Sequence, residues 1–313
     1  MRQIYLSSGF AAFSIVILLL IWSFSGGYEI YIANLLLVYI VLSLGMHVVI
    51  GEAGQFSLAH TAFYGIGIYV SGLMVNNWGL PFPWPLIAGG LVAGAIGLVL
   101  GTVSLRVRDI YLALATFAFG EAMQWVFSNW NEVTGGPNGL NIKPMHFGSI
   151  VILNDVGAYP FLAISTVVMA LIAVVISRSR AGRSFRAVRE SEIAATAMGI
   201  SVRRTKIVAF AISAAFAGFA GGMFSLFSTY INPASLGFQT TIIVLTMVVV
   251  GGLGSIFGAI TGAVFFGLIT EILRQVPSYQ EIIYGGILIF FMMFAPRGFA
   301  AGLMDRLRSS QHG

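Results

Sequence analysis

Three polar side chains interrupt long apolar stretches of this sequence and are the first candidates for chemistry. Gln55 and His60 flank a glycine-containing turn, and Glu121 lies in the middle of an apolar segment. An ionisable group inside a membrane costs about 2.5–3.5 kcal/mol on insertion scales, so each needs a partner or a water-filled cavity. A turn within the membrane leaves backbone N–H and C=O groups without helical hydrogen bonds, and these groups also need contact with protein or water. Together with Ser57, these residues predict a polar translocation route between apolar helices.

Each of these polar residues also has a simpler interpretation. A single histidine in an apolar helix, such as His60, is typical of an interhelical hydrogen bond. Glu121 has no basic neighbour in the sequence, and protonation would remove its charge. Glu271 is followed three residues later by Arg274, a spacing that favours an ion pair at the membrane surface over a substrate contact.

A second candidate site is the stretch 134–140, which is rich in glycine and holds one proline. Such a composition predicts a compact turn. A gate or a contact with a substrate-binding protein fits this stretch, and a plain connecting turn fits it equally well. The candidate residues are Thr134, Gly135, Gly136, Pro137 and Asn138.

The segment 182–200 is the best candidate for a partner contact. It consists mostly of good helix formers, with Gly199 placed to end a helix and Ser201 placed to cap the next one. Four apolar residues recur at spacings that share one helical face, while the charged residues project elsewhere. The candidate docking residues are Arg183, Phe185, Arg186, Val188, Arg189, Glu192, Ala195, Met198 and Gly199.

Two kinds of partner suit this segment equally well on composition. Its arginines would suit acidic lipid headgroups, on which an amphipathic helix can rest. A docking helix for a soluble protein has the same chemistry, because it needs an apolar strip to bury and charges that fix its register.

The composition places these candidates in a membrane protein. Apolar residues make up 58% of 313 positions and charged residues only 9%, too few to cover a water-facing surface. The net charge of +5 does not indicate nucleic acid, since half of the basic residues lie between Arg178 and Lys206. The sequence holds no cysteine, no phosphate-binding loop and no hydrolase or zinc motif, and its histidines are scattered. We therefore expect no catalysis, cofactor or metal in this chain.

Hydropathy predicts an all-α polytopic protein with about ten transmembrane helices. The first segment also has features of a signal peptide, and we interpret it as an uncleaved span. The segment 238–250 is short and ends at a glycine-rich turn, so a re-entrant element is an alternative there. The expected segments are 9–25, 30–50, 60–77, 85–105, 109–130, 160–177, 207–230, 238–250, 255–273 and 281–295.

The basic residues predict the orientation. With the N-terminus inside, the segment 178–206 and its eight basic residues fall on the cytoplasmic side, and only Lys143 and Arg274 fall outside. The loop 131–159 is then periplasmic, and both termini are cytoplasmic. Among the other basic residues that fall inside are Arg106, Arg108, Arg297, Arg306 and Arg308.

Several motifs resemble those of ABC importer permeases. The run Ile193-Ala194-Ala195 with Gly199 is similar to their EAA loop, although the acid, Glu192, stands one place upstream of the usual position. The stretch 51–60 resembles the GxAGQxSLGH signature of branched-chain amino acid permeases of the LivM type, with Ala59 in place of the usual glycine. The stretches 112–116, 119–121, 134–140, 251–255 and 296–298 also resemble that family.

The resemblance, which covers roughly residues 30 to 303, implies a single permease domain, 1–313, of the type II-like ABC importer architecture in the bacterial inner membrane. It implies a second homologous permease subunit, two cytoplasmic ATPase subunits that bind ATP and magnesium, and a periplasmic binding protein. The segment 178–206 would couple the ATPases to alternating access for branched-chain amino acids. Urea or amide transport is an alternative within the family, and a secondary transporter or channel is a more distant one.

Overall fold

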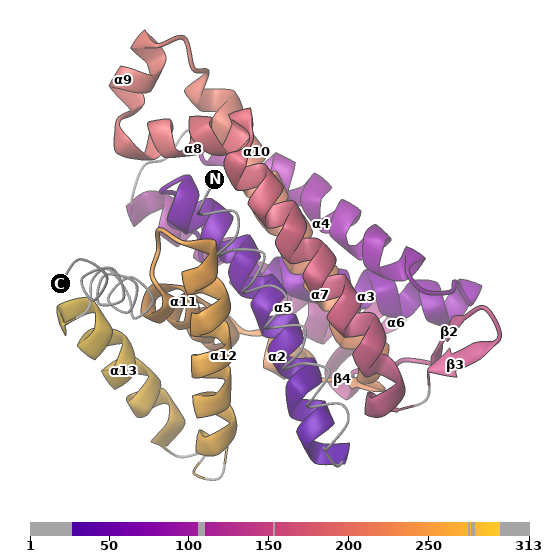
Figure 1. Cartoon of the computed structure of the whole chain (residues 1–313). Coiled ribbons are helices and arrows are strands. Elements are labelled where there is room, and N and C mark those ends of the chain that lie inside the picture. Colours follow the sequence, from indigo (N-terminus) through magenta and orange to yellow (C-terminus); the bar gives the residue numbers. More distant parts are fainter. Residues whose placement is uncertain (1–26, 106–109, 153, 275, 277–278, 295–313) are drawn as a thin grey trace.

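The computed structural model describes residues 27–105, 110–152, 154–274, 276 and 279–294 (Figure 1). The expected first span, both termini, Arg106, Arg108 and the stretch 296–298 lie outside these ranges. The long helices are α2 (Gly27–Met46), α3 (His60–Trp78), α4 (Trp84–Val103), α5 (Ile110–Asn129), α7 (Asp155–Arg178), α10 (Val202–Phe227), α11 (Phe238–Gly251), α12 (Ile256–Leu273) and α13 (Gln280–Phe294).

Each apolar segment that falls within the described residues forms a helix close to its expected bounds. Within the described part of the chain, six stretches are long and apolar enough to cross a membrane: Gly27–Glu52, Trp84–Val103, Ile110–Asn129, Asp155–Arg178, Val202–Phe227 and Ile256–Leu273. The polytopic membrane fold is therefore confirmed, while the count of ten spans stays a prediction. At 14 residues, α11 is about 21 Å long, against a hydrocarbon core of about 30 Å.

Close backbone contact holds the centre of the bundle together. Helix α10 packs against α3 and α4 where Gly67, Gly89 and Gly218 meet. A methyl group on Gly67 would lie 2.0 Å from the carbonyl oxygen of Gly218, and one on Gly218 would lie 2.4 Å from that of Gly89. In lipid, where helices gain little from burying apolar surface against each other, small residues allow the close packing that drives association.

Short elements cap one end of the bundle, so the all-α description needs an amendment. They are α6 (Asn131–Thr134), the 3₁₀ turns η2 (Gly136–Asn138) and η3 (Pro233–Leu236), and four strands. The strands β1 (Leu140–Asn141) and β4 (Tyr230–Ile231) pair antiparallel, as do β2 (Met145–Phe147) and β3 (Ile150–Ile152). They lie at the end opposite to the remaining helices, α8 and α9 (Figure 1).

The loop 131–159 ends earlier than expected. Helix α7 begins at Asp155 because the side chain of Asn154 accepts a hydrogen bond from the backbone N–H of Gly157, which satisfies one free donor of the first turn. Pro160, the first residue of the expected segment, lies inside α7. The expected segment began at Pro160 because hydropathy follows the apolar residues, and the helix tolerates the hydrogen bond that proline removes.

The segment 182–200 is broken into two helices, so the expectation of one continuous helix is wrong. Helix α8 spans Arg180–Glu190, and α9 spans Glu192–Ala197. The break occurs at Ser191, whose backbone is extended and whose hydroxyl accepts a hydrogen bond from the N–H of Ala194. The caps predicted at the far end are confirmed: Gly199 has a φ of 79°, and the hydroxyl of Ser201 accepts from the N–H of Arg204.

Candidate functional site

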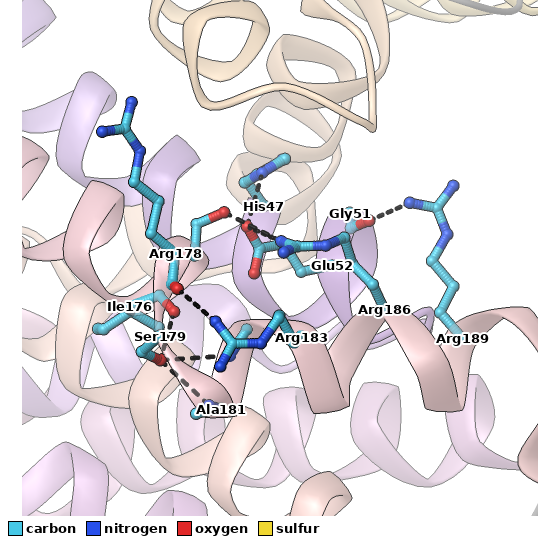
Figure 2. Close-up of polar contacts among 12 residues, drawn as sticks. His47, Gly51, Glu52, Ile176, Arg178, Ser179, Ala181, Arg183, Arg186 and Arg189 are labelled. Carbon is cyan, nitrogen blue, oxygen red and sulfur yellow. Dashed lines mark hydrogen bonds and ion pairs between the residues drawn. The ribbon is translucent and has the colours of Figure 1, made fainter. Parts of the chain in front are cut away.

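The first group of candidate residues lies where α8 meets the end of α2. Helix α2 continues into a π-helical turn, η1 (His47–Glu52), and two arginines of α8 reach this turn (Figure 2). Arg189 donates a hydrogen bond to the carbonyl oxygen of Gly51. Arg186 lies 3.6 Å from the Glu52 carboxylate and also donates to the hydroxyl of Ser177, at 3.2 Å. These contacts fix α8 to the first membrane helix of the described chain.

Glu52 is the residue that sequence reasoning missed at this junction. Its side chain is 6% exposed, and His47 lies 3.9 Å from the same carboxylate oxygen that faces Arg186. Below these charges Phe185 packs in a small apolar cluster with Val48, and Val188 is buried as well. The available signal in the sequence was an acidic residue directly after a long apolar segment, on the side of the membrane where most arginines were predicted to lie. π-Helical turns occur frequently at functional sites.

Helix α9 exposes an apolar surface. Ile193 is 86% exposed and Met198 is 83% exposed, with Ala194, Ala197 and Gly199 exposed around them. We call this group, Ile193, Ala194, Ala197, Met198 and Gly199, the α9 surface. The sequence placed Met198 on the same face as Phe185, but the break at Ser191 turns α9 away from α8.

Three other predicted docking residues make contacts that stabilise α8 and α9, and of these Arg183 and Glu192 are also exposed. Ala195 is buried, and Glu192 forms an ion pair of 2.6 Å with Lys206 at the start of α10. Arg183 donates to the carbonyl oxygen of Arg178 at the end of α7. These contacts hold the two short helices on the ends of α7 and α10.

The predicted route residues are divided between a buried loop and an open cleft. Gln55 and Ser57 are buried in the loop that joins η1 to α3. Among the described atoms, the side-chain amide of Gln55 has no hydrogen-bond partner. His60 is also buried; its Nε2 lies 2.9 Å from the Leu42 carbonyl oxygen, and its Nδ1 lies 3.5 Å from the Ser213 hydroxyl. His60 thus connects α3 with α2 and α10, as the simpler interpretation held.

The cleft is a shallow, open one that lies between α3, α5 and the start of α11. Leu58, inside the predicted turn, and Thr61, directly after it, line the cleft together with Glu121. The structure therefore places the turn beside Glu121 as predicted, but the residues that line the cleft with Glu121 are Leu58 and Thr61, not Gln55, Ser57 or His60. The other lining residues are Ala62, Phe117, Gly120, Leu236, Gly237, Phe238 and Thr241.

Hydroxyl groups brace the turn beside this cleft. Thr61 and Thr241 form a hydrogen bond of 2.6 Å between their hydroxyls, and Thr241 lies 3.5 Å from the Leu58 carbonyl oxygen. The Thr116 hydroxyl accepts a hydrogen bond from the Leu58 N–H at 2.9 Å. The start of α3, the middle of α5 and the start of α11 are thus joined around one loop, which would allow a shift of any of them to reshape the cleft.

The candidate turn at the opposite end is tightly built. Thr134 donates its hydroxyl to the carbonyl oxygens of Phe127 and Trp130 and accepts from the N–H of Gly136. The carbonyl oxygen of Asn138 accepts from the Tyr230 hydroxyl at 3.0 Å. Gly135, with a φ of 78°, and Pro137 complete the turn. The turn is therefore a tightly hydrogen-bonded cap on this end of the bundle, and its role as a gate or a protein contact stays a prediction.

Replacing Gly136 by alanine should destabilise this cap. Gly136 has a φ of 58°, and a methyl group there would lie 1.8 Å from the Asn131 side-chain oxygen. Gly148 has the same φ of 58° with no atom within 4 Å of such a methyl group, so Gly148→Ala carries only the backbone cost, about 1 kcal/mol. We expect Gly136→Ala to lower the thermal midpoint of the purified protein clearly more than Gly148→Ala. Equal midpoints would show that the cap is loosely packed.

Comparison with known proteins identifies the family. Residues 29–292 match the family model described as branched-chain amino acid transport system / permease component. The permease protein LivM of the high-affinity branched-chain amino acid transport system of Escherichia coli K12 is 37% identical over 291 residues, covering 85% of this chain and 68% of LivM. LivH of the same organism is 29% identical over 282 residues, covering 83% of this chain and 90% of LivH. BraD of Pseudomonas aeruginosa is 24% identical over 287 residues, with 83% and 90% covered.

No solved structure matches this chain. The family model extends from the start of α2 to the end of α13, and so it includes the α8–η1 junction, the α9 surface and the cleft. The six long apolar helices agree with the membrane location of such a permease. The chain therefore belongs to the family of branched-chain amino acid transport permeases of ABC systems, and it is a multi-pass protein of the bacterial inner membrane.

Proposed function

We propose that this chain is one of two different permease subunits of an ABC importer that moves branched-chain amino acids into the cell. Two ATPase subunits, which bind ATP and magnesium, would power it, and a periplasmic binding protein would deliver the substrate. This chain itself would hold no cofactor and carry out no catalysis. The relatives named above belong by name to branched-chain amino acid systems, so they give no support to urea or an amide as the substrate.

The observation that carries this proposal is the α9 surface at the basic end of the bundle. Isolated exposed apolar residues are common, but here one large residue stands on a six-residue helix and another directly follows it, and an ion pair and a buried alanine fix that helix. A fixed apolar surface surrounded by charges is typical of a protein interface. We infer that the ATPase subunits dock there and that 178–206 is the coupling segment.

The junction between α8 and η1 supplies a route for coupling. A displacement of α8 by the ATPases would pull on Gly51 and Glu52 through Arg189 and Arg186. The loop that follows η1 leads within a few residues to Leu58 and Thr61 at the cleft. Alternating access would follow if this loop and α5 move relative to each other.

The exposed face of α5 supplies the place for the second permease subunit. Few side chains of α5 are buried in this chain, and Glu121 is exposed beside the cleft. A carboxylate facing lipid at this depth would cost about 2.5–3.5 kcal/mol, so this face requires protein or water. We therefore place the translocation route at the cleft, between this chain and the homologous subunit.

Accessibility of single cysteines should establish the orientation, because the chain has no cysteine of its own. Cysteine at Asn141, in β1, should react with a membrane-impermeant thiol reagent added to cells with a permeabilised outer membrane. Cysteine at Met198, which is exposed on the α9 surface, should react only after the inner membrane is opened. The reverse pattern would invert the proposed topology of ten spans with both termini in the cytoplasm.

Reconstitution tests the proposed function directly. The chain, co-expressed with the second permease and the ATPase subunits of its own operon, should take up leucine into proteoliposomes when the cognate binding protein and ATP are supplied. Uptake should stop when ATP is replaced by a non-hydrolysable analogue. Uptake of urea but not leucine, or uptake of leucine without ATPase subunits, would refute the proposal.

A further inference from the structure

The cleft beside Glu121 combines apolar walls with one carboxylate. Leu58, Ala62, Leu236 and the two phenylalanines form the walls, and Glu121 is the ionisable residue among the lining residues. No cation lines the cleft, and within the described ranges no ion pair or hydrogen bond of the Glu121 side chain is found. The cleft therefore presents one carboxyl group beside apolar side chains, with no cationic side chain among its lining residues.

Two further features of the cleft favour a cation. Phe117 lies four residues before Glu121 and so shares its helical face. The ring of Phe117 meets the ring of Phe238 edge to face, with centroids 4.9 Å apart. Aromatic faces attract ammonium groups, and they do so most strongly where water is excluded. The hydroxyls of Thr61 and Thr241 bond to each other, which leaves them oxygen lone pairs for a further donor.

We infer that this cleft is a binding site for the ammonium group of an amino acid with an apolar side chain. Glu121 accepts the ammonium group, and the aliphatic and aromatic walls pack against the side chain. The inference rests on the proposed function, and it names the chemical group that this site selects. It separates amino acids from urea and amides, which are neutral and would not compensate the carboxylate.

A cysteine introduced in place of Gly120 reports on the occupancy of this cleft. A methyl group at Gly120 would meet only the Leu58 carbonyl oxygen, at 3.5 Å, so the larger side chain fits there. In the complete complex with Gly120→Cys, alkylation by a small water-soluble thiol reagent should slow several-fold when leucine or 3-methylbutylamine is added. 4-Methylpentanoate, which keeps the carboxylate and the side chain but lacks the ammonium group, should not protect.

The additional change Glu121→Gln should abolish protection by leucine, while Glu271→Gln should preserve it. Glu271 is a suitable control because it is a carboxylate of the membrane helices that is already paired with Tyr28 and Arg274, away from the cleft. Equal protection by 4-methylpentanoate, protection that survives Glu121→Gln, or no alkylation of the Gly120→Cys variant under any condition would each overturn the inference. Loss of the second permease subunit in Glu121→Gln would also overturn it, because the carboxylate would then serve assembly.

Leucine uptake separates this inference from the proposed function. If the unmodified complex takes up leucine and Glu121→Gln reduces uptake at least tenfold, both stand. If the unmodified complex takes up leucine and Glu121→Gln is equally fast, the ammonium site is wrong and the importer assignment stands. If the unmodified complex takes up no leucine, the proposed function fails.

Discussion

Replacing Ile193 and Met198 together by aspartate should release the ATPase subunits from this permease. Both side chains are more than four-fifths exposed, so neither contributes to the packing of this chain. Apolar anchors near the centre of an interface contribute about 2 kcal/mol each, and two of them together correspond to a loss of affinity on the order of 1,000-fold. We expect a purified complex without ATPase subunits and without ATP-driven uptake.

The conservative pair Ile193→Leu and Met198→Leu is the matched control for this experiment. It keeps the apolar surface and should keep both the ATPase subunits and uptake. The aspartate variant should also retain the thermal midpoint of the isolated permease, because the changed side chains face away from it. Retention of the ATPase subunits at normal stoichiometry in the aspartate variant would remove the docking role from the α9 surface.

Replacing Arg186 by glutamine should uncouple ATP hydrolysis from transport. Arg186 joins α8 to the buried carboxylate of Glu52 at 3.6 Å, and its loss leaves that carboxylate without its arginine partner. Breaking a fully buried ion pair costs roughly 3–5 kcal/mol, but the Arg186 side chain is 46% exposed, and solvent screening reduces this cost. We expect uptake to fall at least tenfold while the ATPase subunits remain bound and continue to hydrolyse ATP.

Two further variants separate coupling from stability at this junction. Arg180→Gln removes an exposed arginine of the same helix and should leave uptake unchanged. Combining Glu52→Gln with Arg186→Gln removes the unpaired buried charge, so thermal stability should recover while uptake should not. Normal uptake by Arg186→Gln, or loss of the ATPase subunits from it, would show that the α8–η1 contact does not transmit motion.

The sequence by itself determined the membrane class, the approximate position of each long apolar helix described here and the family. These properties depend on local composition: a run of apolar residues must become a helix in lipid, because every backbone polar group has to be satisfied within the segment. The caps at Gly199 and Ser201 were predictable for the same reason, since they depend on a few adjacent residues. The early start of α7 at Asp155 was missed because hydropathy does not detect a polar first turn.

Only the tertiary structure decided which candidates act together. No local pattern could predict that Arg186 and Arg189 reach Glu52 and Gly51, more than 130 positions earlier in the chain. Met198 is exposed because the chain changes direction at Ser191. The spacing of apolar residues predicts a shared face only within one continuous helix, so it does not apply across this break. The cleft likewise depends on three helices meeting at one loop. Contacts between distant segments are set by how the helices pack, and that packing cannot be read from residue spacing alone.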